Sequence, residues 1–211
     1  MRFDRRRFLT GTVASGMAAI APNLGAVSLQ YDDYTNSALG VRLRKPPNWQ
    51  FASARAFTAA QSELVDRLSR ADLERLRQEL NGDDPVLVIT KRSLRTRGFV
   101  PMIHLLVDPI SSTPIQFRTL LPRCPSAIAP YFENYRIERE LQISELSGFE
   151  FGQFTAQYLE TIDSQKYTCR LNFYVGMTNR AELTFCSLGL CSGPDECSEQ
   201  FSSVMQTVQF F

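Results

Sequence analysis

The chain has 211 residues, of which 44% are hydrophobic and 21% charged, and its formal net charge is +1. This is the composition of an ordinary globular protein, and it excludes a disordered or low-complexity chain. The first 28 residues hold four of the 23 basic and one of the 22 acidic side chains, so the remainder has a net charge of −2. A slightly acidic domain is a poor candidate for general nucleic-acid binding, and we expect no nucleic-acid partner.

The N-terminus has the three parts of an export signal. Paired arginines are followed by a weakly apolar stretch to Ile20, by Pro22, and by small residues before a cleavage position after Ser28. The arginine pair predicts a twin-arginine signal over residues 1–28, with the motif Arg5, Arg6, Phe8 and Leu9. The alternative is a basic N-terminus without a targeting role. No later run of about 18 apolar residues is present, so residues 29–211 are expected to form one domain that does not span a membrane.

The first third of this domain predicts strands and then helix. Tyr31–Ser37 is polar and is interpreted as a short lead-in, and Leu39–Arg44 alternates as a strand does. Pro46 and Pro47 end that strand, and Trp49–Phe51 restarts an extended segment. Leucines at helical spacing over Thr58–Leu80 predict one or two helices.

The middle of the chain predicts a hairpin and an irregular crossing. Val86–Thr90 is a β-branched run and predicts a buried strand, with Met102–Val107 as its hairpin partner. The connection between them is basic. Four later prolines indicate a long irregular crossing, and Ser126–Glu138 is expected to hold a helix that starts near Pro130.

The last third predicts a run of strands and a final helix. Leu141–Leu146 is the first strand, Ser147-Gly148 forms the turn, and a change of register near Gly152 suggests a bulge. Two further strands alternate over Tyr167–Val175 and Ala181–Phe185. Pro194 is expected to open a helix with the apolar stripe Cys197, Phe201, Val204, Met205 and Val208. Hairpins without βαβ alternation predict an α+β domain, mainly an antiparallel sheet with helices packed on its faces.

The segment Leu39–Trp49 resembles the opening strand, proline and tryptophan of PsbP-like proteins, and the order of elements to Phe211 is also similar. The resemblance covers most of the chain from about residue 30. It implies an α/β/α sandwich built for protein contacts rather than catalysis. PsbP-like proteins support photosystem II in the thylakoid lumen, with a calcium dependence, and relatives on this fold in other bacteria are envelope proteins. The basic hairpin and the C-terminal cysteines depart from the family.

Few residues could carry chemistry. The one histidine, His104, lies within a predicted strand, where a lone histidine is most often structural. No Gly-x-Ser-x-Gly elbow, phosphate-binding glycine loop or histidine-rich zinc pattern is present. The acidic pairs Asp32-Asp33, Asp83-Asp84 and Asp195-Glu196 lack the spacing of a calcium loop. We therefore predict no catalytic, cofactor or metal residues and no enzyme, with calcium implied by the resemblance alone.

The cysteines predict one disulfide. An exported protein folds in an oxidising compartment, and the best pair lies among Cys186, Cys191 and Cys197. Cys169 lies in an apolar stripe and is expected to be a buried thiol. The odd number of five leaves at least one cysteine free or intermolecular.

The basic connection is the sharpest surface feature, since it holds Lys91, Arg92, Arg95 and Arg97. It is either a solvated turn or a docking patch for an acidic protein surface or anionic lipid headgroups. The leading hypothesis is an exported, non-catalytic binding or assembly protein of the thylakoid lumen or periplasm, acting on a membrane complex such as photosystem II. The alternatives are a hydrolase or redox enzyme of the envelope, and a carrier that holds a small ligand between sheet and helix.

Overall fold

The computed structural model describes residues 27–30, 32–52, 86–96, 98–108, 110, 113–162 and 164–211. Its main element is a sheet of seven strands in the order β4-β5-β6-β10-β9-β8-β7, in which every neighbouring pair is antiparallel. The strands are β4 (Gln50–Ala52), β5 (Leu87–Thr90), β6 (Met102–Asp108), β7 (Glu133–Leu146), β8 (Phe149–Ile162), β9 (Gln165–Met177) and β10 (Glu182–Leu190). This arrangement, with helices beside it, confirms the predicted α+β class.

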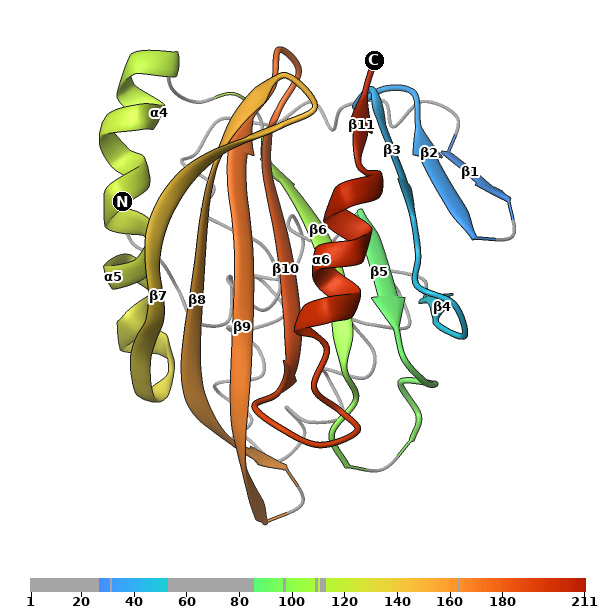
Figure 1. Cartoon of the computed structure of the whole chain (residues 1–211), viewed down its shortest axis with the longest axis vertical. Coiled ribbons are helices and arrows are strands. Elements are labelled where there is room, and N and C mark those ends of the chain that lie inside the picture. The colour runs from blue at the N-terminus through green and yellow to red at the C-terminus, as the bar shows by residue number, and fades with distance from the viewer. Residues whose placement is uncertain are drawn as a thin grey trace, which may run out of the picture.

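A smaller sheet and one helix cover one face of the large sheet (Figure 1). The small sheet has the order β1-β2-β3-β11, and the helix is α6. Their bounds are β1 (Val27–Gln30), β2 (Asp33–Asn36), β3 (Val41–Arg44), α6 (Ser198–Thr207) and β11 (Gln209–Phe210). Phe201, Val204 and Met205 of α6 are buried, as the predicted stripe requires, and each contributes about 2 kcal/mol to folding by leaving water.

The large sheet has an apolar core on each face. Successive side chains of a strand point to opposite faces, so Phe185 and Cys186 of β10 enter different cores. The first core lies under α6, β3 and β11 and includes Phe151, Phe185 and Phe201. The second includes Ile128, Phe154 and Phe173 and lies on the other face.

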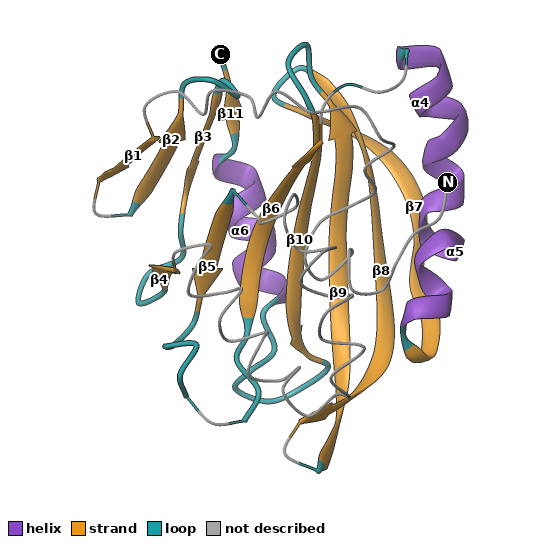
Figure 2. Ribbon diagram, turned by 180° about the vertical axis from the view of Figure 1, so that it is seen from behind, coloured by secondary structure: helices purple, strands orange, loops and turns teal. Residues whose placement is uncertain are grey.

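The segment between β6 and β7 is helical, so the predicted irregular crossing is wrong. It contains α4 (Pro114–Leu120), η1 (Leu121–Arg123), α5 (Cys124–Ile128) and η2 (Ala129–Tyr131), which lie along the β7 side of the large sheet (Figure 2). Each of the four begins with a proline in its first two positions. Proline fits there because those backbone N–H groups have no partner within a helix. The prolines therefore start short helices rather than break them.

The predicted helix over Ser126–Glu138 is also wrong beyond its first residues, because β7 begins at Glu133. Tyr135 and Ile137 are partly buried while Arg136 and Glu138 are exposed, which is the period of a strand. Tyr135 packs against the second core, and Phe132 stacks beside it with ring centroids 6.0 Å apart. Pairing with β8 along this length outweighs the local helical signal.

The bulge predicted at Gly152 is absent, since β8 pairs with β9 without a break from Phe151 to Ile162. The irregularities lie in β7 instead, the last of them between Arg139 and Gln142. The aromatic pattern changes at Gly152 because Phe151 enters the first core and Phe154 the second. A Cβ on Gly152 would lie 2.9 Å from the Leu121 side chain, so glycine is needed there for helix packing and not for a bulge.

Other predictions are confirmed or lie outside the described residues. The hairpin of β5 and β6 is confirmed by antiparallel pairing, and Ser147 and Gly148 form a turn with positive φ angles. The polar lead-in contains strand β2, which pairs with both β1 and β3. The twin-arginine motif and the helices expected over 58–80 lie outside the described residues. Strand β1 spans the predicted cleavage position after Ser28.

Candidate functional site

The basic connection between β5 and β6 is fixed to the loop before α6. Arg92 donates hydrogen bonds to both carboxylate oxygens of Asp195, at 2.9 and 2.6 Å, and one to the Phe99 carbonyl at 2.5 Å. Lys91 lies with its Nζ 3.5 Å from Asp195 and also contacts the Pro194 carbonyl. The hydrogen bond from Arg92 holds the pKa of Asp195 below its usual value. One carboxylate therefore anchors two of the four predicted docking residues.

The other two residues of the connection differ in what the structure shows. Arg95 is exposed and makes no ion pair with any described residue. Arg97 lies outside the described residues. Arg95 is therefore presented to solvent. Lys91 and Arg92 together with Asp195 leave one further positive charge on the anchored part of the connection.

A network of paired charges lies beside α6, on the part of the large sheet that neither α6 nor the small sheet covers. Arg170 donates to Glu138 at 2.7 Å and to Glu196 at 3.5 Å, and Glu196 accepts the Ser198 backbone N–H at 2.8 Å at the start of α6. The side-chain amide of Gln157 contacts Glu138. Arg136 donates to the Gln157 oxygen at 2.9 Å, so the network joins β7, β8, β9 and α6.

A polar groove of 410 Å³ lies beside this network, between the sheet and α6. Asn172 lines it, and its side-chain amide donates to Ser187 at 3.0 Å and to Ser198 at 3.3 Å. Thr155 donates to the Asn172 oxygen at 3.1 Å. Tyr174 also lines the groove, and its ring packs edge to face against that of Phe201 with the ring centroids 5.6 Å apart. The polar residues Gln153, Thr155 and Gln157 alternate with the apolar face of β8, and this alternation is the sequence signal that marks the site.

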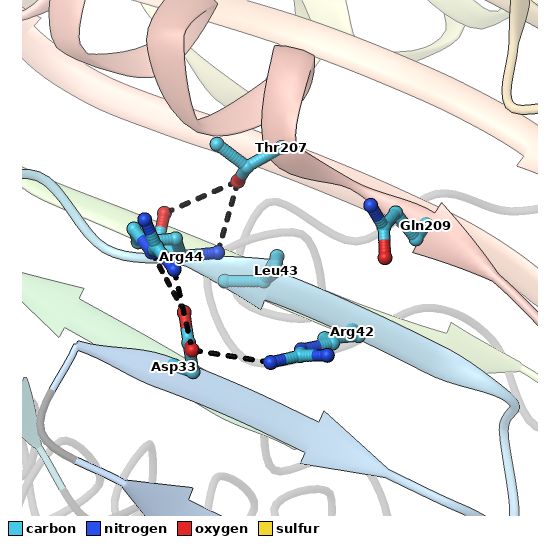
Figure 3. A pocket seen from close by; sticks show the side chains of 6 residues that line it. All are labelled: Asp33, Arg42, Leu43, Arg44, Thr207 and Gln209. Atoms are coloured by element: carbon cyan, nitrogen blue, oxygen red, sulfur yellow. Dashed lines mark hydrogen bonds and ion pairs between the residues drawn. The ribbon is translucent and has the colours of Figure 1, made fainter.

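A second, smaller hollow of 310 Å³ lies where the small sheet meets the end of α6 (Figure 3). Asp33 of β2 accepts hydrogen bonds from Arg44 at 2.8 Å and Arg42 at 3.3 Å, and the Arg44 bond lowers the pKa of Asp33. Thr207 accepts the Arg44 backbone N–H at 2.9 Å and so ties α6 to β3. Asp33 and Thr207 are thus already hydrogen-bonded within the protein. The residues around this hollow are best explained as a structural link between the small sheet and α6.

The histidine and three of the five cysteines are buried. His104 of β6 is 3% exposed, and burial lowers its pKa to about 4. Burial raises the pKa of Cys124 to about 11 and those of Cys169 and Cys197 to about 12. At neutral pH these thiols are protonated, and a protonated thiol is a poor nucleophile. Cys169 is buried, as predicted.

The predicted disulfide among Cys186, Cys191 and Cys197 is not formed, since all five cysteines are free. The reason is geometric. Cys186 points into the second core, whereas Cys197 belongs to the first core on the opposite face of β10. Cys197 packs there against Gly189, where an added Cβ would come within 2.5 Å of its sulfur. A thiol cannot reach through the sheet, so sequence spacing overestimated the proximity of these residues.

The acidic pairs that the structure describes are bound to cations of the chain itself. Asp32 pairs with Lys45 and Asp33 with two arginines, while Asp195 and Glu196 hold Arg92 and Arg170. Within the described ranges, no three side chains of the metal-binding types lie close enough together to hold an ion. Asp83-Asp84 lies outside those ranges. The calcium dependence implied by the resemblance stays a prediction.

No family model matches the chain, and no curated protein matches it in sequence. Among solved structures, it is similar to LpqN of Mycobacterium tuberculosis, a protein involved in cell envelope biogenesis, with a TM-score of 0.49 and 12% identity over 80% of this chain and 82% of that one. It is also similar to the cyanobacterial PsbP of Synechocystis sp. PCC 6803, with a TM-score of 0.44 and 14% identity over 93% of this chain and 100% of that one. Both similarities concern the fold at low TM-score, and no function is transferred from them.

Proposed function

We propose that this chain is an exported, non-catalytic binding or assembly protein that docks on a membrane-associated protein complex through the connection between β5 and β6. The observation that carries the proposal is the bidentate pair of Arg92 with Asp195, which fixes the basic connection to the loop before α6 and leaves Arg95 exposed. A held, charged loop loses less conformational entropy on binding than a free one. The compartment is the thylakoid lumen or the periplasm, and photosystem II is one such complex.

The charge of the connection sets the chemistry of the partner. The domain after residue 28 has a slightly negative net charge, so the basic connection is a local patch of the opposite sign, and such a patch is complementary to an acidic protein surface. Two cations share Asp195, and Arg95 adds a further positive charge. Exposed charges are screened beyond about 8 Å at physiological ionic strength, so binding should weaken as salt rises.

The test uses the purified protein and membranes from its own host. Binding is measured by co-sedimentation at increasing salt for the wild type, Arg95→Glu and Arg123→Glu. Arg123 is the matched control, because it is also exposed and lies in η1, along the β7 side of the sheet. We expect Arg95→Glu to weaken binding about tenfold, as expected for the loss of a charge pair of roughly 1.4 kcal/mol, and Arg123→Glu to leave it unchanged. Binding that is insensitive both to salt and to Arg95→Glu would contradict the proposal.

A further inference from the structure

The face of the large sheet that carries α6 changes character along its strands. On β8, buried Phe151 is followed on the same face by Gln153, Thr155 and Gln157. On β9 the same face carries Tyr174, then Asn172 and Arg170, and β10 contributes Ser187. Figure 1 shows that α6 and the small sheet leave β7, β8 and β9 uncovered on this side. The polar half of the face is thus a wall beside the groove that no described helix or strand covers.

The polar groups of this wall are held in fixed positions. Arg170 is pinned between Glu138 and Glu196, and Asn172 between two hydroxyls. Their bonds connect neighbouring strands to the first turn of α6. Groups that are already ordered need no further ordering when a ligand binds, so such a wall is preorganised. A merely solvated sheet face has no need of these cross-links.

The groove also keeps unused hydrogen-bonding capacity. The side chains of Gln153 and Ser202 line it, and neither makes a hydrogen bond with another described side chain or backbone group. Arg139 lines it as well and has no carboxylate partner among the described residues. Burial raises the pKa of the nearby Tyr174 hydroxyl, and the positive charge of Arg139 partly opposes that rise. The groove and the adjoining network together have a net charge of +1. Their charged side chains are Arg136, Arg139, Arg170, Glu138 and Glu196.

We propose that this groove binds a short glycan segment that carries a carboxylate. Sugar hydroxyls both donate and accept hydrogen bonds, and the groove offers both functions through amide, hydroxyl, guanidinium and carboxylate groups. Arg139 receives the carboxylate in a charge-assisted, bidentate pair. The partly buried ring of Tyr174 supplies an apolar surface for the C–H face of a sugar ring. The volume of 410 Å³ is in the range of small-ligand sites.

The composition of the groove favours a glycan over a peptide. A peptide that binds through apolar side chains needs apolar pockets, and one that binds as an added strand needs a free strand edge. The aromatic side chain of Phe201 is 2% exposed and already packed, and the groove is lined by side chains on the face of the sheet, from the edge strand β7 inward to β9. This site is separate from the basic connection, so the inference does not depend on the function proposed above.

The test measures binding of three probes to the purified protein by calorimetry: trigalacturonate, its neutral methyl ester and triglutamate. Three variants change exposed residues, so each should fold. Arg139→Gln removes the anchoring charge, Ser202→Trp fills the groove from α6, and Arg123→Gln is the control outside it.

We expect wild type to bind trigalacturonate and Arg139→Gln to bind it about tenfold more weakly. The methyl ester should bind wild type about tenfold more weakly too, with no further loss in Arg139→Gln. Ser202→Trp should abolish the binding of trigalacturonate and of its methyl ester, and Arg123→Gln should leave the affinity for each of them unchanged. Absence of trigalacturonate binding, or binding unaffected by Ser202→Trp, would overturn the proposal. Equal affinity for triglutamate would identify an acidic-peptide site instead.

Discussion

Replacing Gly176 of β9 by alanine should destabilise the protein by forcing a buried ring to move. A Cβ added at Gly176 would lie 2.3 to 2.5 Å from three ring carbons of Phe151, a separation that real Cβ atoms essentially never show. Phe151 is 0% exposed and stacks on Phe210 with ring centroids 5.8 Å apart. The ring therefore cannot move without disturbing β11 and the first core.

The size of the effect follows from two opposing contributions. Overpacking a filled core costs about 1–3 kcal/mol, whereas alanine in a strand gains up to about 1 kcal/mol over glycine. Because the added Cβ meets three carbons of a fully buried ring, we take the upper end of the overpacking cost, which gives a net loss of about 2 kcal/mol in the free energy of unfolding. For a domain of this size, that corresponds to a fall of roughly 4–8 °C in Tm.

Urea unfolding of the purified protein measures this loss, and a double-mutant cycle assigns its cause. In a Phe151→Leu background the smaller side chain leaves room, so Gly176→Ala should cost less than about half as much as in wild type. Gly148→Ala is the control, because nothing lies within 4 Å of its added Cβ and only its φ of +85° opposes the change. The reasoning is refuted if Gly176→Ala costs less than about 0.5 kcal/mol, or if its cost is the same in both backgrounds.

Three further predictions concern export, charge and protonation. Lysine at both Arg5 and Arg6 should leave precursor inside the cell, as seen by immunoblotting of cell fractions, and normal export would contradict the twin-arginine signal. Asp195→Asn should cost about 1 kcal/mol at neutral pH. Because the pKa of Asp195 is lowered on folding, this cost should vanish as pH falls well below 3.8, and a cost independent of pH would refute the pair. The pKa of His104, about 4, lies below its unfolded value of 6.5. As pH falls from 6.5 to 4, the unfolded state therefore takes up a proton that the folded state does not, and stability should fall by about 3 kcal/mol. Its NMR ring signals should not shift between about pH 8 and 5, and a midpoint near 6.5 would show that the ring is accessible.

The strands whose two faces differ could be predicted from the sequence, because alternation reports burial directly. Strand β3 is an example, since its residues are alternately buried and exposed, as the alternation over Leu39–Arg44 predicts. Where both faces are buried, the same rule fails. Phe151 and Phe154 suggested a bulge because one apolar face was assumed, while each enters a different core.

The misassigned segments failed for a different reason. The prolines from Pro114 to Pro130 indicate a break, but whether a proline ends a helix or begins one depends on which turn it occupies. The start of β7 is set by pairing with β8, a contact between residues more than twenty positions apart. Local sequence does not contain that information.

The candidate sites show the same limit. The basic connection could be found from charge alone, yet its anchor Asp195 lies 103 residues from Arg92. Sequence spacing placed three cysteines together, whereas the sheet separates the side chains of Cys186 and Cys197. Side-chain partners that are distant in sequence depend on topology, which alternation and composition do not determine.

The most direct measurement of the proposed function is crosslinking in the native host. A photoreactive residue is placed at position 95 or, as the matched control, at position 123, both of which are exposed. The proposal predicts one discrete adduct of higher mass in the membrane fraction from position 95, suppressed by high salt, and none from position 123. No adduct from position 95, or the same adducts from both positions, would contradict docking through the connection between β5 and β6.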